Sequence, residues 1–192
     1  MRILLTGSKG QLGRCFKDRL PEEWELIAAD SATLDITDAE AIKGMVKELE
    51  IGCIINCAAW TNVDKAEDDV ARADLINNQA AGNLAYAAKE AGATLIHVST
   101  DYVFDGNSCK PYKEEDATNP QTVYGRTKLA GEENVIRSCA GSMVIRTAWL
   151  YSTFGNNFVK TMLRLAETHD KLNVVCDQIG SPTYCALSMV AA

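Results

Sequence analysis

Tyr124 and Lys128, four residues apart, are the side chains of this sequence best suited to acid–base chemistry. On a helix this spacing places both side chains on one face. The tyrosine phenol has a reference pKa of about 10, which makes it a poor proton donor or acceptor at neutral pH. A lysine ammonium within about 4–6 Å favours the phenolate and lowers the pKa of the tyrosine. An ordinary surface pair can have the same spacing. The position of the pair in the fold therefore has to decide whether it is catalytic.

Thr100 precedes this pair in the chain and directly follows a predicted strand at Thr94–Ser99. Its hydroxyl can donate a hydrogen bond to the carbonyl of a substrate. In open α/β sheets, ligands bind outside the carboxyl ends of the strands. We therefore predict that Thr100, Tyr124 and Lys128 act together on a carbonyl substrate at such an edge.

The segment Gly7-Ser8-Lys9-Gly10-Gln11-Leu12-Gly13 follows a short apolar strand and opens a helix. In dinucleotide-binding folds the first glycine makes a tight turn, the second lets the backbone approach a pyrophosphate, and the third lets the helix pack closely. Backbone N–H groups at a helix start bind phosphate without a net positive charge. The segment predicts a nicotinamide dinucleotide site, with a glycine-rich turn that binds no ligand as the alternative.

Asp30 ends the second predicted strand, about twenty residues after the glycine segment, where an acidic group can contact the ribose. A carboxylate there accepts hydrogen bonds from the 2′-hydroxyl and repels a 2′-phosphate, which favours NADH. Lys9 and Arg14 are expected near the same pocket and can pair with a 2′-phosphate, which favours NADPH. Asp30 could instead be only a turn residue, and Asp35 could reach the adenine edge or act as a cap. The sequence leaves the cofactor preference open.

Short apolar runs alternate with longer helical patterns along the chain, as in parallel βαβ units. They predict an α/β fold, a Rossmann-type doubly wound parallel sheet. Thr37-Asp38-Ala39-Glu40 has the pattern of a capping box, and Asn119-Pro120 that of an N-cap followed by proline. Asp101–Thr118 lacks periodicity, which indicates a functional or disordered loop. The predicted strands are Arg2–Thr6, Glu25–Ala28, Cys53–Asn56, Thr94–Ser99, Ser142–Thr147 and Leu172–Val175, and the predicted helices are Gly10–Leu20, Asp38–Glu50, Val70–Ala91, Pro120–Ser138 and Asn156–His169.

The composition argues against several classes of protein. A net charge of −7 over 192 residues, without a basic run, disfavours a nucleic-acid or anionic-membrane surface. The apolar run before Gly7 is too short to span a membrane. Seven cysteines without a Cys-x-x-Cys pair indicate reduced thiols and hence a cytoplasmic protein. Because His97 and His169 lie far apart in the sequence, we expect no metal site.

Several segments of the sequence resemble the extended short-chain dehydrogenase/reductase family, and within it the dTDP-4-dehydrorhamnose reductases. The segment Ser99–Gly106, Ser-Thr-Asp-Tyr-Val-Phe-Asp-Gly, is far more specific than the glycine segment, and the resemblance covers the whole chain. The other matching segments are Gly7–Gly13, Asn56–Glu67, Val123–Glu132, Arg146–Tyr151, Gly155–Met162 and Asp177–Thr183.

The resemblance implies that Tyr124 protonates a C4 keto oxygen and that Lys128 holds the nicotinamide ribose and lowers the tyrosine pKa. Tyr102 and Trp149 would approach the sugar, although either could instead be a core aromatic. Trp60 stands where the family commonly has histidine, which puts a polar contact there in doubt. The implied catalytic residues are Thr100, Tyr124 and Lys128, the implied cofactor-binding residues are Gly7, Gly10, Gln11, Leu12, Gly13, Asp30, Asp35, Ala58, Ala59, Thr61, Tyr124 and Lys128, and the implied substrate-binding residues are Val63, Thr100, Asp101, Tyr102 and Trp149.

The activity that the resemblance implies is NADPH- or NADH-dependent reduction of dTDP-4-dehydro-6-deoxy-L-mannose to dTDP-L-rhamnose. One alternative is an extended-family reductase or epimerase of a different nucleotide sugar. The other is a regulatory subunit like the β subunit of methionine adenosyltransferase, against which the complete catalytic trio argues. Family members pair as dimers, in some cases through Mg²⁺, which implies a homodimer here, but the sequence shows no ligands for that ion.

Members of this group continue well past the position of Thr183, into elements that complete the sugar-nucleotide pocket. We therefore expect residues 1–175 to form the dinucleotide-binding domain and residues 176–192 to begin an incomplete substrate lobe. On this interpretation the 192 residues bind the dinucleotide but show little or no reductase activity, because remote binding energy also positions the reacting carbonyl. Apolar surface left uncovered would also favour self-association.

Overall fold

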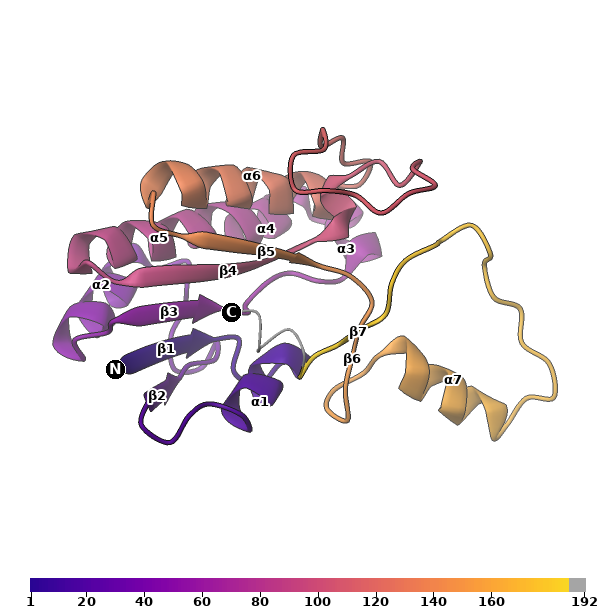
Figure 1. The fold of residues 1–192 in the computed structure, drawn as a ribbon, viewed down its shortest axis with the longest axis horizontal. Coiled ribbons are helices and arrows are strands. Elements are labelled where there is room, and N and C mark those ends of the chain that lie inside the picture. Colours follow the sequence, from indigo (N-terminus) through magenta and orange to yellow (C-terminus); the bar gives the residue numbers. More distant parts are fainter. Residues whose placement is uncertain (187–192) are drawn as a thin grey trace.

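A computed structural model of the chain describes residues 1–186, and its centre is a five-stranded parallel sheet (Figure 1). The strands lie in the order β2-β1-β3-β4-β5, so the chain leaves β1 on one side and returns to β3 on the other. The topological switch point therefore lies between β1 and β3, which confirms the predicted doubly wound α/β fold. The strands are β1 Arg2–Thr6, β2 Glu25–Ala28, β3 Cys53–Asn56, β4 Thr94–Thr100 and β5 Met143–Thr147.

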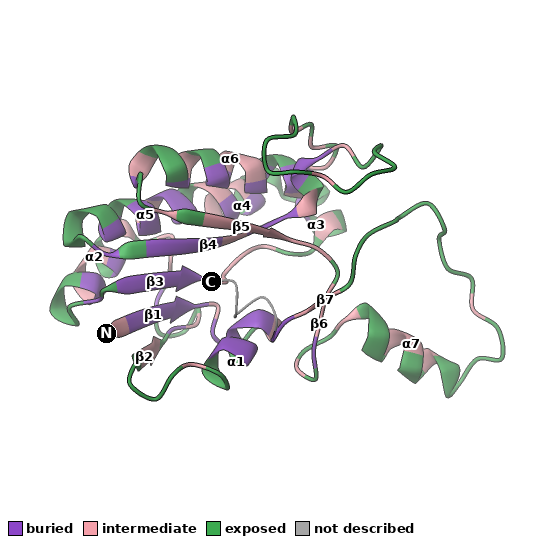
Figure 2. Cartoon of the chain, viewed as in Figure 1, coloured by how far each residue is buried: buried purple, intermediate pink, exposed green. Residues whose placement is uncertain are grey.

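Helices cover both faces of this sheet, because successive strand residues point to opposite faces. Leu4, Ile54 and Leu95 belong to one buried cluster, which includes side chains of α2, α5 and α6. Their neighbours Ile3, Ile55 and Ile96 belong to a second cluster, under α1. Figure 2 shows β1, β3 and β4 buried between the two layers. The helices are α1 Gln11–Lys17, α2 Ala39–Glu48, α5 Ala80–Ala91 and α6 Val123–Ser138.

The long helix predicted at Val70–Ala91 forms, but a π turn interrupts it. It consists of α4 Val70–Asp74, the π turn η1 Leu75–Gln79, and α5. Asn77, in the turn, is buried, and its carbonyl oxygen lies against Gly131 of α6. Beyond the turn, the alanine-rich face of α5 is buried against the sheet, as the composition predicts.

Two predicted helix caps are wrong by one and three residues, because a different side chain caps each helix. Asp38, rather than Thr37, caps α2 by accepting hydrogen bonds from the backbone N–H groups of Glu40 and Ala41. Thr122 caps α6 and accepts from the N–H of Gly125. The chain at Asn119 lies outside the helix, and its N–H donates to the Val103 carbonyl.

The predicted strand at Leu172–Val175 is wrong. This segment is irregular and lies away from the sheet (the yellow trace in Figure 1), with Val174 and Val175 exposed. A strand needs a neighbour for its backbone groups, and an apolar run alone does not provide one. Two short strands, β6 Leu150–Tyr151 and β7 Thr183–Tyr184, pair with each other instead. The remaining α-helices of residues 1–186 are α3 Val63–Asp68, which the sequence analysis missed, and α7 Phe158–Ala166, and a short 3-10 helix, η2, spans Asp101–Val103.

An ion pair between buried Glu132 and partly exposed Arg146 fixes α6 against the sheet. Glu132 on α6 is 3% exposed and accepts from Nε of Arg146 on β5 at 3.1 Å and from its Nη2 at 2.6 Å. The hydroxyl of Ser99, on β4, also donates to this carboxylate. The helix that carries Tyr124 and Lys128 is therefore held by charge as well as by apolar packing.

We predict opposite effects for two glycine-to-alanine changes in helices. Gly44 in α2 has open space around its position, so Gly44→Ala should stabilise the protein by about 1 kcal/mol through helix propensity. Gly131→Ala would drive a Cβ into the Asn77 carbonyl and should destabilise by about 1–3 kcal/mol. Chemical denaturation of both variants measures the difference. Equal effects would show that α6 does not pack against the π turn as described.

Candidate active site

A cavity of about 950 Å³ opens at the carboxyl ends of the strands, beside the switch point between β1 and β3. Its volume suits a ligand of the size of a dinucleotide. The structure brings every residue predicted for the site to the wall of this one cavity. These residues are Gly7, Gly10, Gln11, Leu12, Gly13, Asp30, Asp35, Ala58, Ala59, Thr61, Val63, Thr100, Asp101, Tyr102, Tyr124, Lys128 and Trp149.

The glycine turn between β1 and α1 leaves no room for a Cβ at Gly7 or Gly13. Gly7 has a φ of +65°, and a Cβ there would lie 2.7 Å from the Ala58 nitrogen. A Cβ at Gly13 would overlap the Gly7 carbonyl oxygen, whereas Gly10, the N-cap of α1, faces the cavity. The turn therefore forms a cradle of bare backbone at a helix start, which fits a pyrophosphate.

Asp30 and Asp35 both line the cavity and both form turns. The two alternatives for these residues, a cavity role and a turn or cap role, are therefore compatible. The Asp30 carboxylate accepts from the N–H groups of Ala32 and Thr33 and forms an ion pair with Lys9. The Lys9 hydrogen bond and these backbone donors lower the pKa of Asp30. Asp35 accepts from the N–H and hydroxyl of Thr37, which lower its pKa. Lys9 lines the cavity, whereas Arg14 is not among its lining residues.

Gln11 links the glycine helix to a distant part of the chain. Its Nε2 donates to the Leu150 carbonyl at 3.0 Å, and its Oε1 accepts from Nδ2 of Asn157 at 2.8 Å. Both partners lie more than a hundred residues away in the sequence. The side chain of Gln11 therefore closes one end of the cavity wall, while its backbone belongs to the start of α1.

Asn77 fixes the loop that follows β3. This loop lines the cavity through Ala58, Ala59 and Thr61. Its Oδ1 accepts from the N–H of Trp60 at 2.8 Å, and its Nδ2 donates to the Trp60 carbonyl and to the Thr127 hydroxyl. The loop is thereby tied to the catalytic helix next to Lys128. Trp60 turns its indole N–H to the Asn62 carbonyl, so its side chain supplies a local contact.

The hydroxyls of Thr100 and Tyr124 meet where β4 ends. Thr100 donates to the Asp101 carboxylate at 3.1 Å and accepts from the N–H of Tyr102. The Tyr102 ring meets the Tyr124 ring edge-on, with 5.5 Å between centroids. Tyr102 is 38% exposed, so the alternative that it is a core aromatic is wrong. These groups can donate hydrogen bonds to one carbonyl oxygen in the cavity.

Lys128 is fully buried below them. Its Nζ donates to the Val98 carbonyl at 2.7 Å and lies 3.3 Å from Nε2 of His97. Burial lowers the pKa of Lys128 to about 8, although the nearby Glu132 and Cys57 act in the opposite direction. The lysine therefore sits close to its titration point at physiological pH.

The expectation that Lys128 lowers the pKa of Tyr124 is wrong for this arrangement. Burial raises the pKa of Tyr124, Asp101 and Tyr102 add to the rise, and the hydrogen bond with Thr100 opposes it. The reason is that the Lys128 amine is turned toward the β4 backbone. At neutral pH Tyr124 therefore carries its proton, the form that a general acid requires.

Trp149 is also a cavity residue rather than a core aromatic. It is 37% exposed and has a φ of +48°, unusual for a residue with a side chain. Its ring meets Phe158 of α7 edge-on at 5.7 Å. Backbone strain of this kind is frequent at functional sites. Val63, another residue of the cavity wall, begins α3 directly after its cap Asn62.

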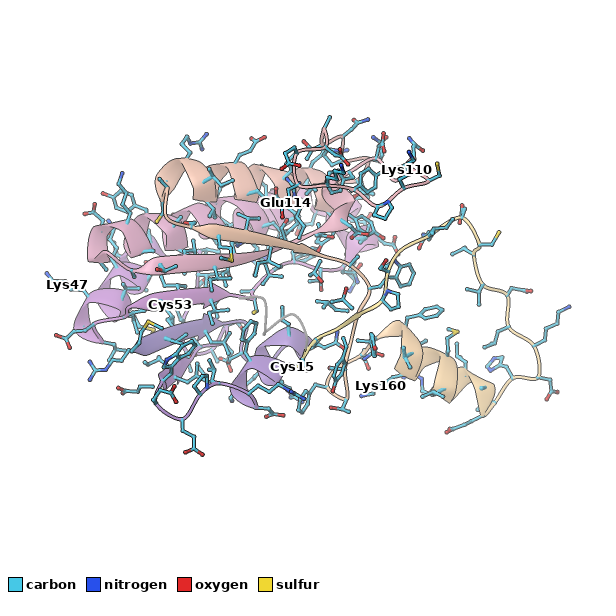
Figure 3. All side chains as sticks on the ribbon, viewed as in Figure 1. Cys15, Lys47, Cys53, Lys110, Glu114 and Lys160 are labelled. Atoms are coloured by element: carbon cyan, nitrogen blue, oxygen red, sulfur yellow. The ribbon has the colours of Figure 1, made fainter. Side chains whose placement is uncertain are left out.

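The loop predicted at Asp101–Thr118 is anchored beside this end of the sheet, where Figure 3 labels Lys110 and Glu114. The rings of Phe104 and Tyr112 stack at 4.2 Å, and the Tyr112 hydroxyl donates to Asp105. Arg146 packs over the Phe104 ring and donates to the Glu114 carbonyl. Of this loop, the cavity wall includes Asp101 and Tyr102.

Four polar residues that lie behind the cavity wall and support the site were missed from the sequence: Asn56, Asn77, His97 and Glu132. Each is buried, and each finds its partner on a different element. The available signal was a polar residue inside an otherwise apolar strand or helix, which predicts a buried hydrogen bond but does not say to what. The cavity wall also includes Thr147, whose buried hydroxyl has no hydrogen-bond partner in residues 1–186.

A model of the family described as RmlD substrate binding domain matches residues 1–191. The chain belongs to this family. The dTDP-4-dehydrorhamnose reductase of Aggregatibacter actinomycetemcomitans is 44% identical over 185 residues, which are 95% of this chain. The chain spans 63% of the length of that relative. Membership of the RmlD family confirms the resemblance predicted from its sequence segments.

Two solved structures show the same fold as this RmlD family member. A dTDP-4-dehydrorhamnose reductase from Clostridium acetobutylicum matches with a TM-score of 0.96 and 47% identity, over 100% of this chain and 69% of that one. The dTDP-4-dehydrorhamnose reductase from Bacillus anthracis, in complex with NADP, matches with a TM-score of 0.96 and 43% identity, over 99% and 68% of the respective chains.

Across residues 1–186, no group of three or more histidine, cysteine, aspartate or glutamate side chains is arranged to hold a metal ion. No helix in the same part of the chain has the length and apolar character needed to cross a membrane.

We predict that Gly10→Val weakens dinucleotide binding while the protein still folds. Valine can adopt the φ of −69° and ψ of 170° found at Gly10, but its side chain would occupy the bare backbone of the cradle. Affinity for NADPH and for NADH should fall by about tenfold or more, equivalent to about 1.4 kcal/mol. Fluorescence titration measures it.

Gly141→Val provides the control, because Gly141 lies in open space and is not part of the cavity wall. It should bind both dinucleotides like the unaltered protein. A folded Gly10→Val protein with unchanged affinity for either cofactor would contradict the assignment of the glycine turn.

Proposed function

We propose that this protein is an NAD(P)H-dependent dTDP-4-dehydrorhamnose reductase, which reduces the C4 ketone of dTDP-4-dehydro-6-deoxy-L-mannose to dTDP-L-rhamnose. The observation that carries the proposal is that Thr100, Tyr124 and Lys128 share one cavity with the glycine turn. The relatives of this name support the substrate. The NADP bound by the Bacillus anthracis protein supports a nicotinamide cofactor.

The chemistry follows from the protonation states in the cavity. The reduced nicotinamide supplies a hydride to C4 of the sugar. Thr100 donates a hydrogen bond to the keto oxygen, and Tyr124 gives that oxygen its phenolic proton, so that the ketone becomes a secondary alcohol. Burial opposes the phenolate that Tyr124 becomes, and the hydrogen bond with Thr100 offsets part of that cost.

Further residues of the cavity would hold the two ligands. The glycine turn would bind the pyrophosphate of the dinucleotide, Ala58, Ala59 and Thr61 would line its path, and Lys128 would hold the nicotinamide ribose. Val63, Asp101, Tyr102 and Trp149 would approach the sugar. Their shared cavity wall supports this division.

Residues 1–175 would form the dinucleotide-binding domain, and residues 176 onward would belong to the substrate lobe, of which 187–192 lie outside the described residues. Seven free cysteines support a reducing, cytoplasmic environment. A homodimer stays a prediction, which a molar-mass measurement in solution tests.

We predict that the full-length protein oxidises NADPH or NADH in the presence of dTDP-4-dehydrorhamnose, and that Tyr124→Phe lowers kcat by about 10²-fold or more. Dinucleotide affinity should change little, because the ring stays in place. Nicotinamide absorbance measures turnover, and a panel of other nucleotide sugars tests the reductases and epimerases of different substrates.

Tyr86→Phe is the matched control. Tyr86 lies on α5, is 45% exposed and contacts Lys43 away from the cavity, so turnover should not change. A Tyr124→Phe protein that retains most of its turnover would remove Tyr124 from the chemistry. A folded protein that binds dinucleotide but reduces no sugar would favour the regulatory alternative.

The Lys9–Asp30 pair leads us to propose that the site accepts both dinucleotides. Asp30 can bind a ribose 2′-hydroxyl, while the exposed Lys9 can leave it for a 2′-phosphate. Asp30→Asn keeps an oxygen for the Ala32 and Thr33 N–H groups but removes the charge that repels the phosphate. The ratio of NADPH to NADH affinity should rise by about tenfold, about 1.4 kcal/mol. An unchanged ratio in parallel titrations would place the 2′ position elsewhere.

A further inference from the structure

A chain of buried hydrogen bonds joins the glycine turn to Lys128, and its first link fixes the orientation of Asn56. Oδ1 of Asn56, at the end of β3, accepts from the hydroxyl of Thr6 at 2.6 Å and from the backbone N–H of Ala58 at 3.1 Å. A backbone N–H can only donate, so this atom must be the amide oxygen. The Asn56 Nδ2, which can only donate, therefore points the other way.

The second link fixes the tautomer of His97. Nδ1 of His97 lies 2.9 Å from Nδ2 of Asn56 and has to accept its hydrogen bond. A neutral imidazole without a proton on Nδ1 carries it on Nε2. An imidazolium would set two donors against each other, and burial together with Lys128 holds the pKa of His97 well below its usual range. His97 is thus a neutral ring whose Nε2–H faces Lys128.

The third link is a contact between His97 and the lysine. Nε2 of His97 lies 3.3 Å from Nζ of Lys128. An ammonium has only donors and cannot accept from the Nε2–H, whereas a neutral amine can accept it and still donate to the Val98 carbonyl at 2.7 Å. The geometry of this contact therefore favours the amine form of Lys128.

The other ionisable groups around Lys128 do not reverse this preference. Cys57, after β3, faces it as a neutral thiol, because burial raises the pKa of Cys57 to about 12. Glu132, one helical turn away on α6, is engaged by Arg146 of β5 and by Ser99 of β4. Tyr124, one turn before it on α6, carries its proton. Among the ion pairs of residues 1–186, none includes Lys128.

We propose that His97 is a positioning residue. Asn56 holds the His97 ring with its Nε2–H directed toward Lys128, and this orientation favours the amine form of that lysine. This inference rests on the proposed function only for its consequence, that Lys128 exchanges a proton near neutral pH instead of staying permanently charged. The chain of hydrogen bonds starts at Thr6, the residue before Gly7. The packing of the glycine turn therefore also helps to fix the orientation of Asn56 and His97.

The first test needs neither substrate nor a variant. Nitrogen-15 NMR of the histidine rings, in the cofactor-free protein between pH 5.5 and 10, should show His97 with a protonated Nε2 and a bare Nδ1 throughout. His169, the other histidine of the chain, is exposed and provides the reference signals in the same sample. A His97 ring protonated on Nδ1, or on both nitrogens, would overturn the proposal.

The second test reverses the tautomer of His97 with Asn56→Asp. The carboxylate keeps acceptors for Thr6 and Ala58 but requires a proton on Nδ1 of His97, so Nε2 becomes an acceptor for the Lys128 ammonium. The Lys128 titration midpoint, followed by carbon-13 NMR at Cε, should rise by about one pH unit or more. His97→Phe keeps a flat ring without nitrogens, and in that background most of the rise should disappear.

A rise of the same size with and without the His97 ring would mean that the new carboxylate acts on Lys128 directly, and the proposal would fail. The pH profile of kcat in the full-length protein should move in the same direction as the Lys128 titration. Since the NMR titrations require no turnover, an inactive protein with the expected titrations would contradict the proposed function and leave this inference standing.

Discussion

The close approach of the β1–α1 turn to the end of β3 is the constraint on which the site depends. Gly7 fits there because it has no Cβ and adopts a positive φ, a few ångströms from the Cys57–Ala58 peptide. That approach brings the Thr6 hydroxyl within hydrogen-bond distance of Asn56. Asn56 in turn fixes Ala58 in the loop after β3 by accepting from its N–H. A wider gap would separate the phosphate cradle from the loop that lines the rest of the cavity. The backbone, rather than any charged side chain, therefore defines the cofactor half.

Two buried ionisable residues one helical turn apart on α6, Glu132 and Lys128, have opposite kinds of partners. Glu132 has a full counter-charge in Arg146, and losing one partner of such a pair costs about 3–5 kcal/mol. Lys128 has neutral dipoles for partners, and its pKa falls to about 8. The first residue holds the helix in place, and the second is left free to change its protonation state. Stability and chemistry are thus divided between neighbouring positions of one helix.

The features predicted correctly from the sequence are those set by local pattern. Apolar runs followed by glycine or polar residues gave β1 to β5, and the spacing of Tyr124 and Lys128 on a helix placed both at the cavity. The strand at Leu172–Val175 failed because apolar character does not reveal whether a sheet edge is near. The contacts of Asn56 with His97 and of Asn77 with Thr127 join residues 41 and 50 positions apart. No periodicity encodes such pairings.

The π turn at Leu75–Gln79 makes the length of its helix as restrictive as its composition. An α-helix advances about 100° per residue, so the additional residue in this turn rotates all that follows by about that angle. Arg72, before the turn, and Leu75 and Ile76, at its start, line the cavity. After the turn, the small side chains of α5 are buried against the sheet. Deleting one residue here would rotate the helix after the turn relative to the helix before it, so that the two segments would no longer present these faces together. A protein that keeps this cavity must therefore keep the residue count of the helix.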